Sequence, residues 1–139
     1  MKIVGLNYTK ISGEKQDKAL KSEISTDISF IDIKKEDVTI KDREVVTVSF
    51  SYTLSYKNSE KKDQKLGHVQ FEGNIAVSLF PDEAKEMWKL WKKKEMSDSM
   101  RVAIFNFILR KCTAKALMLQ DELGLPTHIP LPRFNVSKK

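Results

Sequence analysis

The sequence predicts an α+β fold, in which a four-stranded antiparallel sheet is followed by two C-terminal helices. Residues 44–56 and 68–80 alternate apolar and polar side chains with a period of two, the pattern of strands with one buried face. After residue 80 the apolar side chains recur at helical spacing instead. The change from one period to the other divides the chain into a strand half and a helix half.

The strand half contains two further, less regular apolar stretches, at residues 2–11 and 22–33, and we expect a strand at each. Ile31 and Ile33 fall on the face opposite Ile28 and its neighbours, which predicts a bulge or burial on both faces. A charged connection is expected over 34–42. The polar segment 57–65 suits a hairpin loop between the two clear strands and implies that they pair antiparallel.

The helix half begins at Pro81, which fits the first position of a helix. Ser97 is a good N-cap for a second helix, which we expect to run to Leu123 and to end at Gly124, with Pro126 just beyond. This helix carries two apolar stripes, so it needs a cover besides its own sheet: the first helix, a second subunit or a bound ligand. The first stripe is Phe105, Ile108, Leu109, Cys112, Ala116, Leu119 and Leu123, and the second is Met100, Ile104, Phe107, Ala114, Leu117 and Met118.

Length and composition fit a single folded domain over residues 1–139, with strands over about 2–80, helices over about 81–123 and a proline-rich extended tail over 124–139. Because no apolar run is long enough to span a bilayer and no signal peptide follows Met1, we expect a cytoplasmic protein without membrane insertion. The net charge of +6 favours anionic partners in general, although the lysines are spread over short groups typical of a solvated surface.

The sequence offers no pattern of catalytic or ligating residues. His68 and His128 are far apart, and with one cysteine they have no zinc-ligand spacing; we expect His68 on a polar strand face and His128 at the surface. Cys112 lies within an apolar helical stripe, which predicts a buried, inert thiol. The five glycines form no phosphate-binding loop. We therefore expect a binding protein rather than an enzyme, with no cofactor and no metal.

Three segments resemble the SecB family of export chaperones: residues 4–8 (VGLNY), 71–77 (FEGNIAV) and the proline-broken ending 125–134 (LPTHIPLPRF), in a chain whose order is four strands, two helices and a tail. The resemblance implies a sheet backed by helices, assembled as a dimer of dimers, and an ATP-independent holdase that captures unfolded or preprotein segments in apolar grooves. The acidic members of that family dock the export ATPase through acidic surface. This chain is basic, so a general holdase, or a relative serving other clients such as an antitoxin, fits it better.

These considerations predict two sets of functional residues, both of them apolar. The client-binding set is Phe50, Tyr52, Phe71, Ile75, Ile129, Leu131 and Phe134, and the oligomer interface is Met87, Trp88, Trp91, Ile104 and Phe107. Long strands leave two open sheet edges that must be covered or paired, which together with the two-sided helix predicts a homo-oligomer, a dimer or a tetramer.

Two other functions compete with the holdase hypothesis. A nucleic-acid-binding module would use the positive charge and the lysine-rich face of the first helix, but the aromatic residues fall on apolar stripes and are not interleaved with the lysines as stacking platforms require. An assembly subunit with one dedicated protein partner would need the same apolar surface as a holdase.

Overall fold

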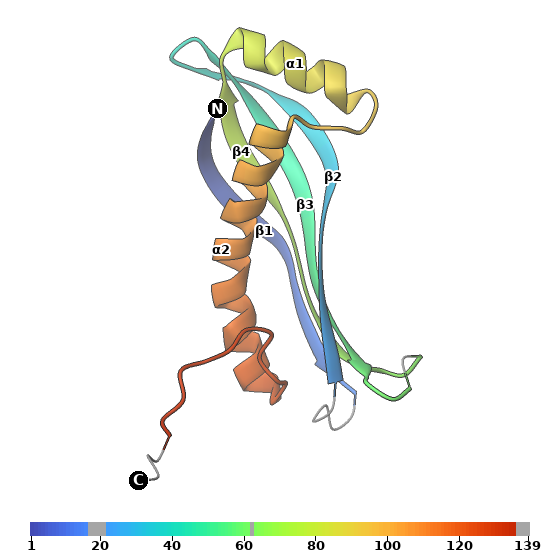
Figure 1. Ribbon diagram of the computed structural model, residues 1–139. Coiled ribbons are helices and arrows are strands. Elements are labelled where there is room, and N and C mark those ends of the chain that lie inside the picture. Colours follow the sequence, from blue (N-terminus) through green and yellow to red (C-terminus); the bar gives the residue numbers. More distant parts are fainter. Residues whose placement is uncertain (17–21, 62, 136–139) are drawn as a thin grey trace.

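The computed structural model describes residues 1–16, 22–61 and 63–135. One antiparallel sheet has the strand order β1-β4-β3-β2, α2 runs along one face of it, and α1 crosses one end (Figure 1). The predicted α+β fold of four strands followed by two helices is confirmed. The elements are β1 (Lys2–Lys15), β2 (Ser22–Ile40), β3 (Arg43–Asn58), β4 (Lys65–Leu79), α1 (Pro81–Trp91) and α2 (Asp98–Leu123).

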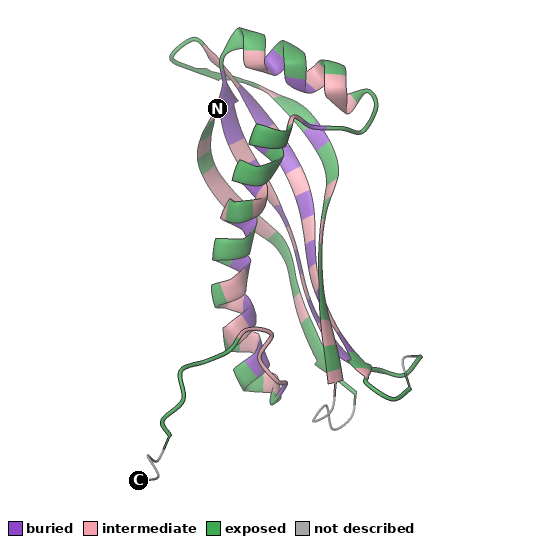
Figure 2. Ribbon diagram, viewed as in Figure 1, coloured by how far each residue is buried: buried purple, intermediate pink, exposed green. Residues whose placement is uncertain are grey.

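The core lies between the sheet and α2, and the two central strands supply most of it. The alternate side chains of β3 and β4 that face α2 are buried, whereas the polar side chains between them are mostly half-buried on the outer face (Figure 2). The antiparallel pairing predicted for these strands is confirmed, with Phe50 opposite Gly73 and Tyr52 opposite Phe71. Gly73 is required there, because a Cβ atom would lie 2.5 Å from the Asn7 carbonyl oxygen.

The second strand is longer than predicted: the charged connection expected over 34–42 is wrong. β2 continues to Ile40, and the chain reverses at Lys41 and Asp42, whose φ angles of 49° and 65° are those of a tight two-residue hairpin turn. Neither residue is the glycine or asparagine that usually occupies such a turn. The predicted bulge is confirmed, because the register shifts between Phe30 and Asp32.

The long helix buries one residue in every four rather than either of the two predicted stripes. Its buried row, which takes members from both stripes, is Met100, Ile104, Ile108, Cys112, Ala116 and Gln120. Four residues turn the helix by about 400°, so this row winds slowly around the axis. A twisted sheet needs a contact line of that kind, because the strands beneath the helix rotate along its length.

The helix ends follow the sequence signals. Pro81 opens α1, where the Phe80 N–H donates a hydrogen bond to Glu83 Oε1 over 2.9 Å, and Ala84 and Met87 are buried. α2 begins directly after Ser97, although the Ser97 hydroxyl makes no capping hydrogen bond. It ends at Gly124, whose φ of 67° is the left-handed conformation that favours glycine.

Candidate functional site

The candidate site is the partly covered apolar surface on the two sides of α2. With the buried row against the sheet, three further rows of α2 can be distinguished. The outward row is Val102, Asn106, Arg110, Ala114, Met118 and Glu122, and all of these residues are exposed. The rows on either side mix half-buried and exposed residues. We call the row containing Phe105 the β2 flank, since Phe105 stacks on Phe30 of β2 with ring centroids 4.8 Å apart. The row containing Lys115 is the β1 flank, since the Lys115 Nζ lies 4.9 Å from the ring centroid of Tyr8 in β1. The β2 flank is Arg101, Phe105, Leu109, Thr113, Leu117 and Asp121; the β1 flank is Ala103, Phe107, Lys111, Lys115, Leu119 and Leu123.

The β2 flank is apolar at three of its six positions, Phe105, Leu109 and Leu117. Ile24, Ile28 and Phe30 of β2 pair in register with buried residues of β3, so they face α2, yet they are only half-buried. One turn beyond Phe105, which stacks on Phe30, the Leu109 side chain is 39% exposed. The chain therefore leaves apolar side chains of α2 and of β2 incompletely covered.

The chain's own tail lies beside α2 near its C-terminal end, over β3. Leu125 is buried, and Tyr56 Oη donates a hydrogen bond to the carbonyl oxygen of Pro126 over 2.6 Å. Between this part of the tail and α2 is a hollow of about 680 Å³, whose lining includes Leu117, Leu125 and Leu131. A proline-containing segment that bends at His128 and Ile129 is thus held by side-chain contacts and by a hydrogen bond to its main chain.

A buried polar network fixes this tail. Gln120 has no exposed surface, and its Nε2 donates to Tyr56 Oη over 2.7 Å and lies 3.0 Å from His128 Nδ1. His128 Nε2 lies 3.3 Å from Tyr52 Oη. One assignment satisfies these contacts: a neutral His128 that carries its proton on Nε2, donates to Tyr52 and accepts from Gln120. The network joins β3, α2 and the tail.

The expectation that His128 is a surface residue is wrong. The ring is half-buried and hydrogen-bonded on both nitrogens, and burial lowers its pKa below the ordinary 6.5. Burial also raises the pKa of Tyr52 to about 12, which keeps the phenol neutral. The hydrogen bonds that hold the tail therefore form with His128 and Tyr52 both neutral.

The β1 flank combines aromatic rings with cations. Arg110 Cζ and Lys111 Nζ lie 5.6 Å and 5.8 Å from the ring centroid of Phe107. Tyr8 Oη donates a long contact of 3.9 Å to Cys112 Sγ. Cys112 is fully buried, as predicted, and burial raises its thiol pKa to about 11.

The residues predicted to bind clients occupy two different environments. Phe50, Tyr52, Phe71 and Ile75 have no exposed surface and form the core beneath α2. In the tail, Ile129 is half-buried, Leu131 is 49% exposed and Phe134 is fully exposed. Client binding by these residues stays a prediction, and in this conformation only the tail members offer accessible surface.

The residues predicted to form an oligomer interface are likewise divided. Met87 and Ile104 are buried within the chain, whereas Trp88, Trp91 and Phe107 are half-buried. A subunit interface would use the latter three. Assembly as a dimer or tetramer stays a prediction that a solution mass would test.

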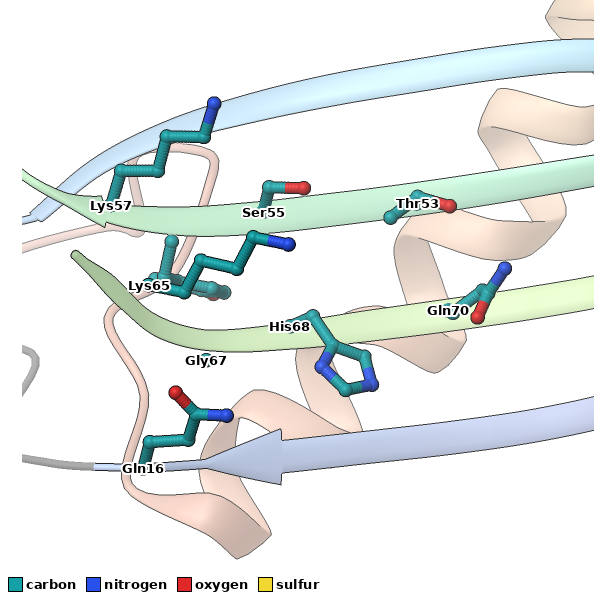
Figure 3. Close-up of a pocket in the computed structure, with 9 residues that line it drawn as sticks. Gln16, Thr53, Ser55, Lys57, Lys65, Gly67, His68 and Gln70 are labelled. Carbon is teal, nitrogen blue, oxygen red and sulfur yellow. The ribbon is translucent and has the colours of Figure 1, made fainter. Parts of the chain in front are cut away.

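The outer face of the sheet carries a separate polar hollow of about 250 Å³ (Figure 3). Lys57 and Lys65, register partners on β3 and β4, lie beside Ser55 and His68 there. Three carboxylates border the same face, because Glu14 is in register with His68, Glu23 with Lys57 and Asp27 with Thr53. They outnumber the two lysines, so this hollow is not a site of concentrated positive charge.

Within the described residues, no group of three or more His, Cys, Asp or Glu side chains is arranged to hold a metal ion. The described helices also include none with the length and apolarity needed to cross a membrane. What α2 and its surroundings do provide is apolar surface beside open strand edges.

The chain is similar to the SecB-like chaperone Rv1957 of Mycobacterium tuberculosis, solved in complex with a ChAD peptide from the Rv1956 HigA1 antitoxin, with a TM-score of 0.55 and 15% sequence identity. The alignment covers 99% of this chain and 91% of that chain. No family model matches the sequence, and no curated protein matches it. The likeness is therefore one of fold.

Proposed function

We propose that this protein is an ATP-independent, holdase-type chaperone that binds unfolded or partner polypeptide segments along the apolar flanks of α2. The observation that carries the proposal is the docked tail. The tail, which has no regular secondary structure and has proline at 126, lies beside α2 and is held through its main chain by Tyr56. A surface that accepts the protein's own irregular segment has the chemistry to accept another.

The uncovered apolar surface supports the same proposal. Leu109 is exposed on the β2 flank, one turn from the half-buried Phe105, and Leu117 of the same flank is half-buried. Apolar side chains left partly uncovered in this way can be covered by an apolar segment of another chain. Recognition by such surfaces tolerates many sequences, as a holdase requires, because apolar contact is not directional.

The open sheet edges add main-chain hydrogen-bonding capacity. Among the described residues β1 pairs with β4 and β2 with β3, and no third strand pairs with either, so the outer edges of the sheet can accept an added strand. Strand addition draws affinity from main-chain hydrogen bonds that are common to all sequences. The structural neighbour Rv1957 was itself solved with a peptide from an antitoxin.

The test is to dilute chemically denatured malate dehydrogenase with and without this protein and to follow light scattering, in the absence of ATP. We expect the wild type to suppress aggregation. Leu109→Asp, which places a charge on the β2 flank without disturbing the core, should weaken suppression, whereas Asn106→Asp on the outward row adds the same charge and should not. Unchanged aggregation with a folded wild-type sample would refute the proposed function.

A further inference from the structure

The part of the tail that docks against the body begins directly after a fixed point. The Leu125 N–H donates to the Gln120 carbonyl oxygen over 2.9 Å, a bond that closes the C-terminal end of α2, and the Leu125 side chain is buried. In the described chain, no backbone–backbone hydrogen bond ties residues 126–129 to a strand or a helix. This docked segment, residues 126–129, can therefore leave the body of the protein without unwinding α2.

Two groups of the docked segment hold it in place. One is the Pro126 carbonyl oxygen, which accepts a hydrogen bond from Tyr56 Oη over 2.6 Å. The other is the His128 ring, whose nitrogens lie 3.0 Å from Gln120 Nε2 and 3.3 Å from Tyr52 Oη. Tyr52, Tyr56 and Gln120 have no exposed surface, so the docked segment lies where a ligand would have to lie in order to reach them.

The body's side of this contact is not specific for the tail. Gln120 Nε2 and Tyr56 Oη are hydrogen-bonded to each other over 2.7 Å, and together they offer a carboxamide and a phenol hydroxyl, groups that can bind the C=O or N–H of any main chain. The adjacent hollow of about 680 Å³, which Leu117 helps to line, adds apolar surface. Another polypeptide segment could therefore use the same contacts once the docked segment has left.

We propose that Tyr56 and Gln120 form a main-chain-binding subsite for unfolded polypeptide, that residues 126–129 occupy this subsite in the free protein, and that protonation of His128 releases them. The inference rests on the proposed function and adds its regulation, because tail and client compete for the same two side chains. The apparent Kd for a client is then the intrinsic Kd divided by the fraction of molecules whose tail is undocked.

Protonation of His128 disfavours the docked arrangement because the ring has no anionic partner there. In the neutral state Nδ1 accepts from Gln120 Nε2, and a proton on Nδ1 would make two N–H groups face each other. Gln120 Oε1 is farther from Nδ1, at 3.3 Å. Exchanging the two amide atoms would place Oε1 at Tyr56 Oη, whose proton is donated to Pro126.

The groups around the ring do not supply the missing negative charge. Tyr52 and Tyr56 are phenols whose pKa is raised by burial, so both are neutral, and Gln120 carries no charge. Of the charged residues near this end of α2, Asp121 is exposed and lines the hollow, and Lys15 of β1 reaches Gly124. Among the described residues, His128 takes part in no ion pair.

The direction of the pH effect follows from the same burial. Burial lowers the pKa of His128 from its ordinary 6.5, so the ring binds a proton more readily after it has left the body. Docking of the segment therefore weakens as pH falls through about 6.5. Since a client needs the undocked state, its affinity should rise over the same pH range.

The experiment measures affinity for an unfolded polypeptide by fluorescence anisotropy, with fluorescein-labelled, reduced and carboxymethylated α-lactalbumin as the probe. We expect the wild type to bind the probe roughly fivefold more tightly at about pH 5.5 than at about pH 7.5, relative to His128→Gln, which cannot take up a proton. This ratio removes any effect of titrating the probe itself. His128→Ala, which weakens docking and leaves the subsite intact, should bind roughly fivefold more tightly than the wild type at about pH 7.5.

A second substitution tests the subsite itself. Tyr56→Phe in the His128→Ala background removes the hydroxyl that binds main chain, so affinity should fall, whereas a mere loosening of the tail would raise it. The matched control is Pro132→Ala, at an exposed tail position beyond the docked segment, which should behave like the wild type at both pH values.

An equal gain at low pH in His128→Gln would mean that another group titrates, and it would overturn the proposal. An unchanged affinity in His128→Ala, or in its combination with Tyr56→Phe, would do the same. If the wild type suppresses aggregation of malate dehydrogenase while these variants bind the probe as it does, the subsite and its regulation are wrong and the holdase function stands. If the probe does not bind and aggregation is not suppressed, both proposals are wrong.

Discussion

The docking of the tail should depend on the side chain of Gln120. Replacing Gln120 by leucine keeps the volume of the side chain and removes both of its hydrogen bonds, one to Tyr56 and one to His128. Tyr56 would still donate to the Pro126 carbonyl, so it is not left without a partner. His128 Nδ1 would lose its partner in a half-buried position.

The expected cost follows from that one unsatisfied group. A buried polar atom without a partner costs about 1–3 kcal/mol, and since His128 is half-buried, Gln120→Leu should lower the free energy of unfolding by about 1 kcal/mol. His128→Ala should cost a similar amount. Since the two residues share one contact, the double variant should lose less than the sum of the single variants, with a coupling of at least about 0.5 kcal/mol.

Urea denaturation of the wild type, both single variants and the double variant measures this coupling directly. Circular dichroism and the intrinsic fluorescence of the tryptophans provide two independent probes of the same transition. Strict additivity of the two substitutions would refute the network, because it would mean that Gln120 and His128 do not interact in the folded protein.

Three further predictions concern the same core and tail. Burial lowers the pKa of His128. As pH falls through about 6.5, His128 of the unfolded chain therefore takes up a proton while the docked ring stays neutral, so the stability of the fold should decrease between about pH 7.5 and 5.5. Urea titrations at both pH values should show a smaller decrease for the His128→Gln variant. Ile108→Ala should cost about 2–5 kcal/mol through the cavity it leaves, whereas Met118→Ala on the outward row should cost less than about 0.5 kcal/mol, and equal costs would contradict the assigned rows. The Cys112 thiol, buried and with its pKa raised to about 11, should resist a thiol-specific reagent at neutral pH until urea unfolds the protein, and rapid labelling of the native state would contradict its position beneath α2.

Local signals predicted most of the fold. The alternation in residues 44–56 and 68–80 located the central strands because both have one fully buried face. Pro81 and Gly124 located the helix limits because each has a backbone preference that acts locally. The hairpin at Lys41 was missed because its residues carry no such preference, and only pairing with β3 holds it.

The site depended on tertiary relations that no local pattern contains. His128 looked like a surface residue between prolines, and its burial arises because Gln120 and Tyr52 come from two other elements. The twist of the sheet selects which residues of α2 are buried, and a straight helical stripe does not predict that row. The strand order that places β1 and β2 at the edges of the sheet was likewise not predictable from a local pattern.

The claim that extended polypeptide binds beside α2 can be tested most directly by amide hydrogen exchange, comparing the free protein with its complex with a denatured polypeptide. We predict slower exchange along an edge strand of the sheet, where main-chain groups on the outer edge become paired, and a smaller change in β3, whose main-chain groups already pair on both sides. A complex that forms while exchange at both edge strands stays the same would contradict this account.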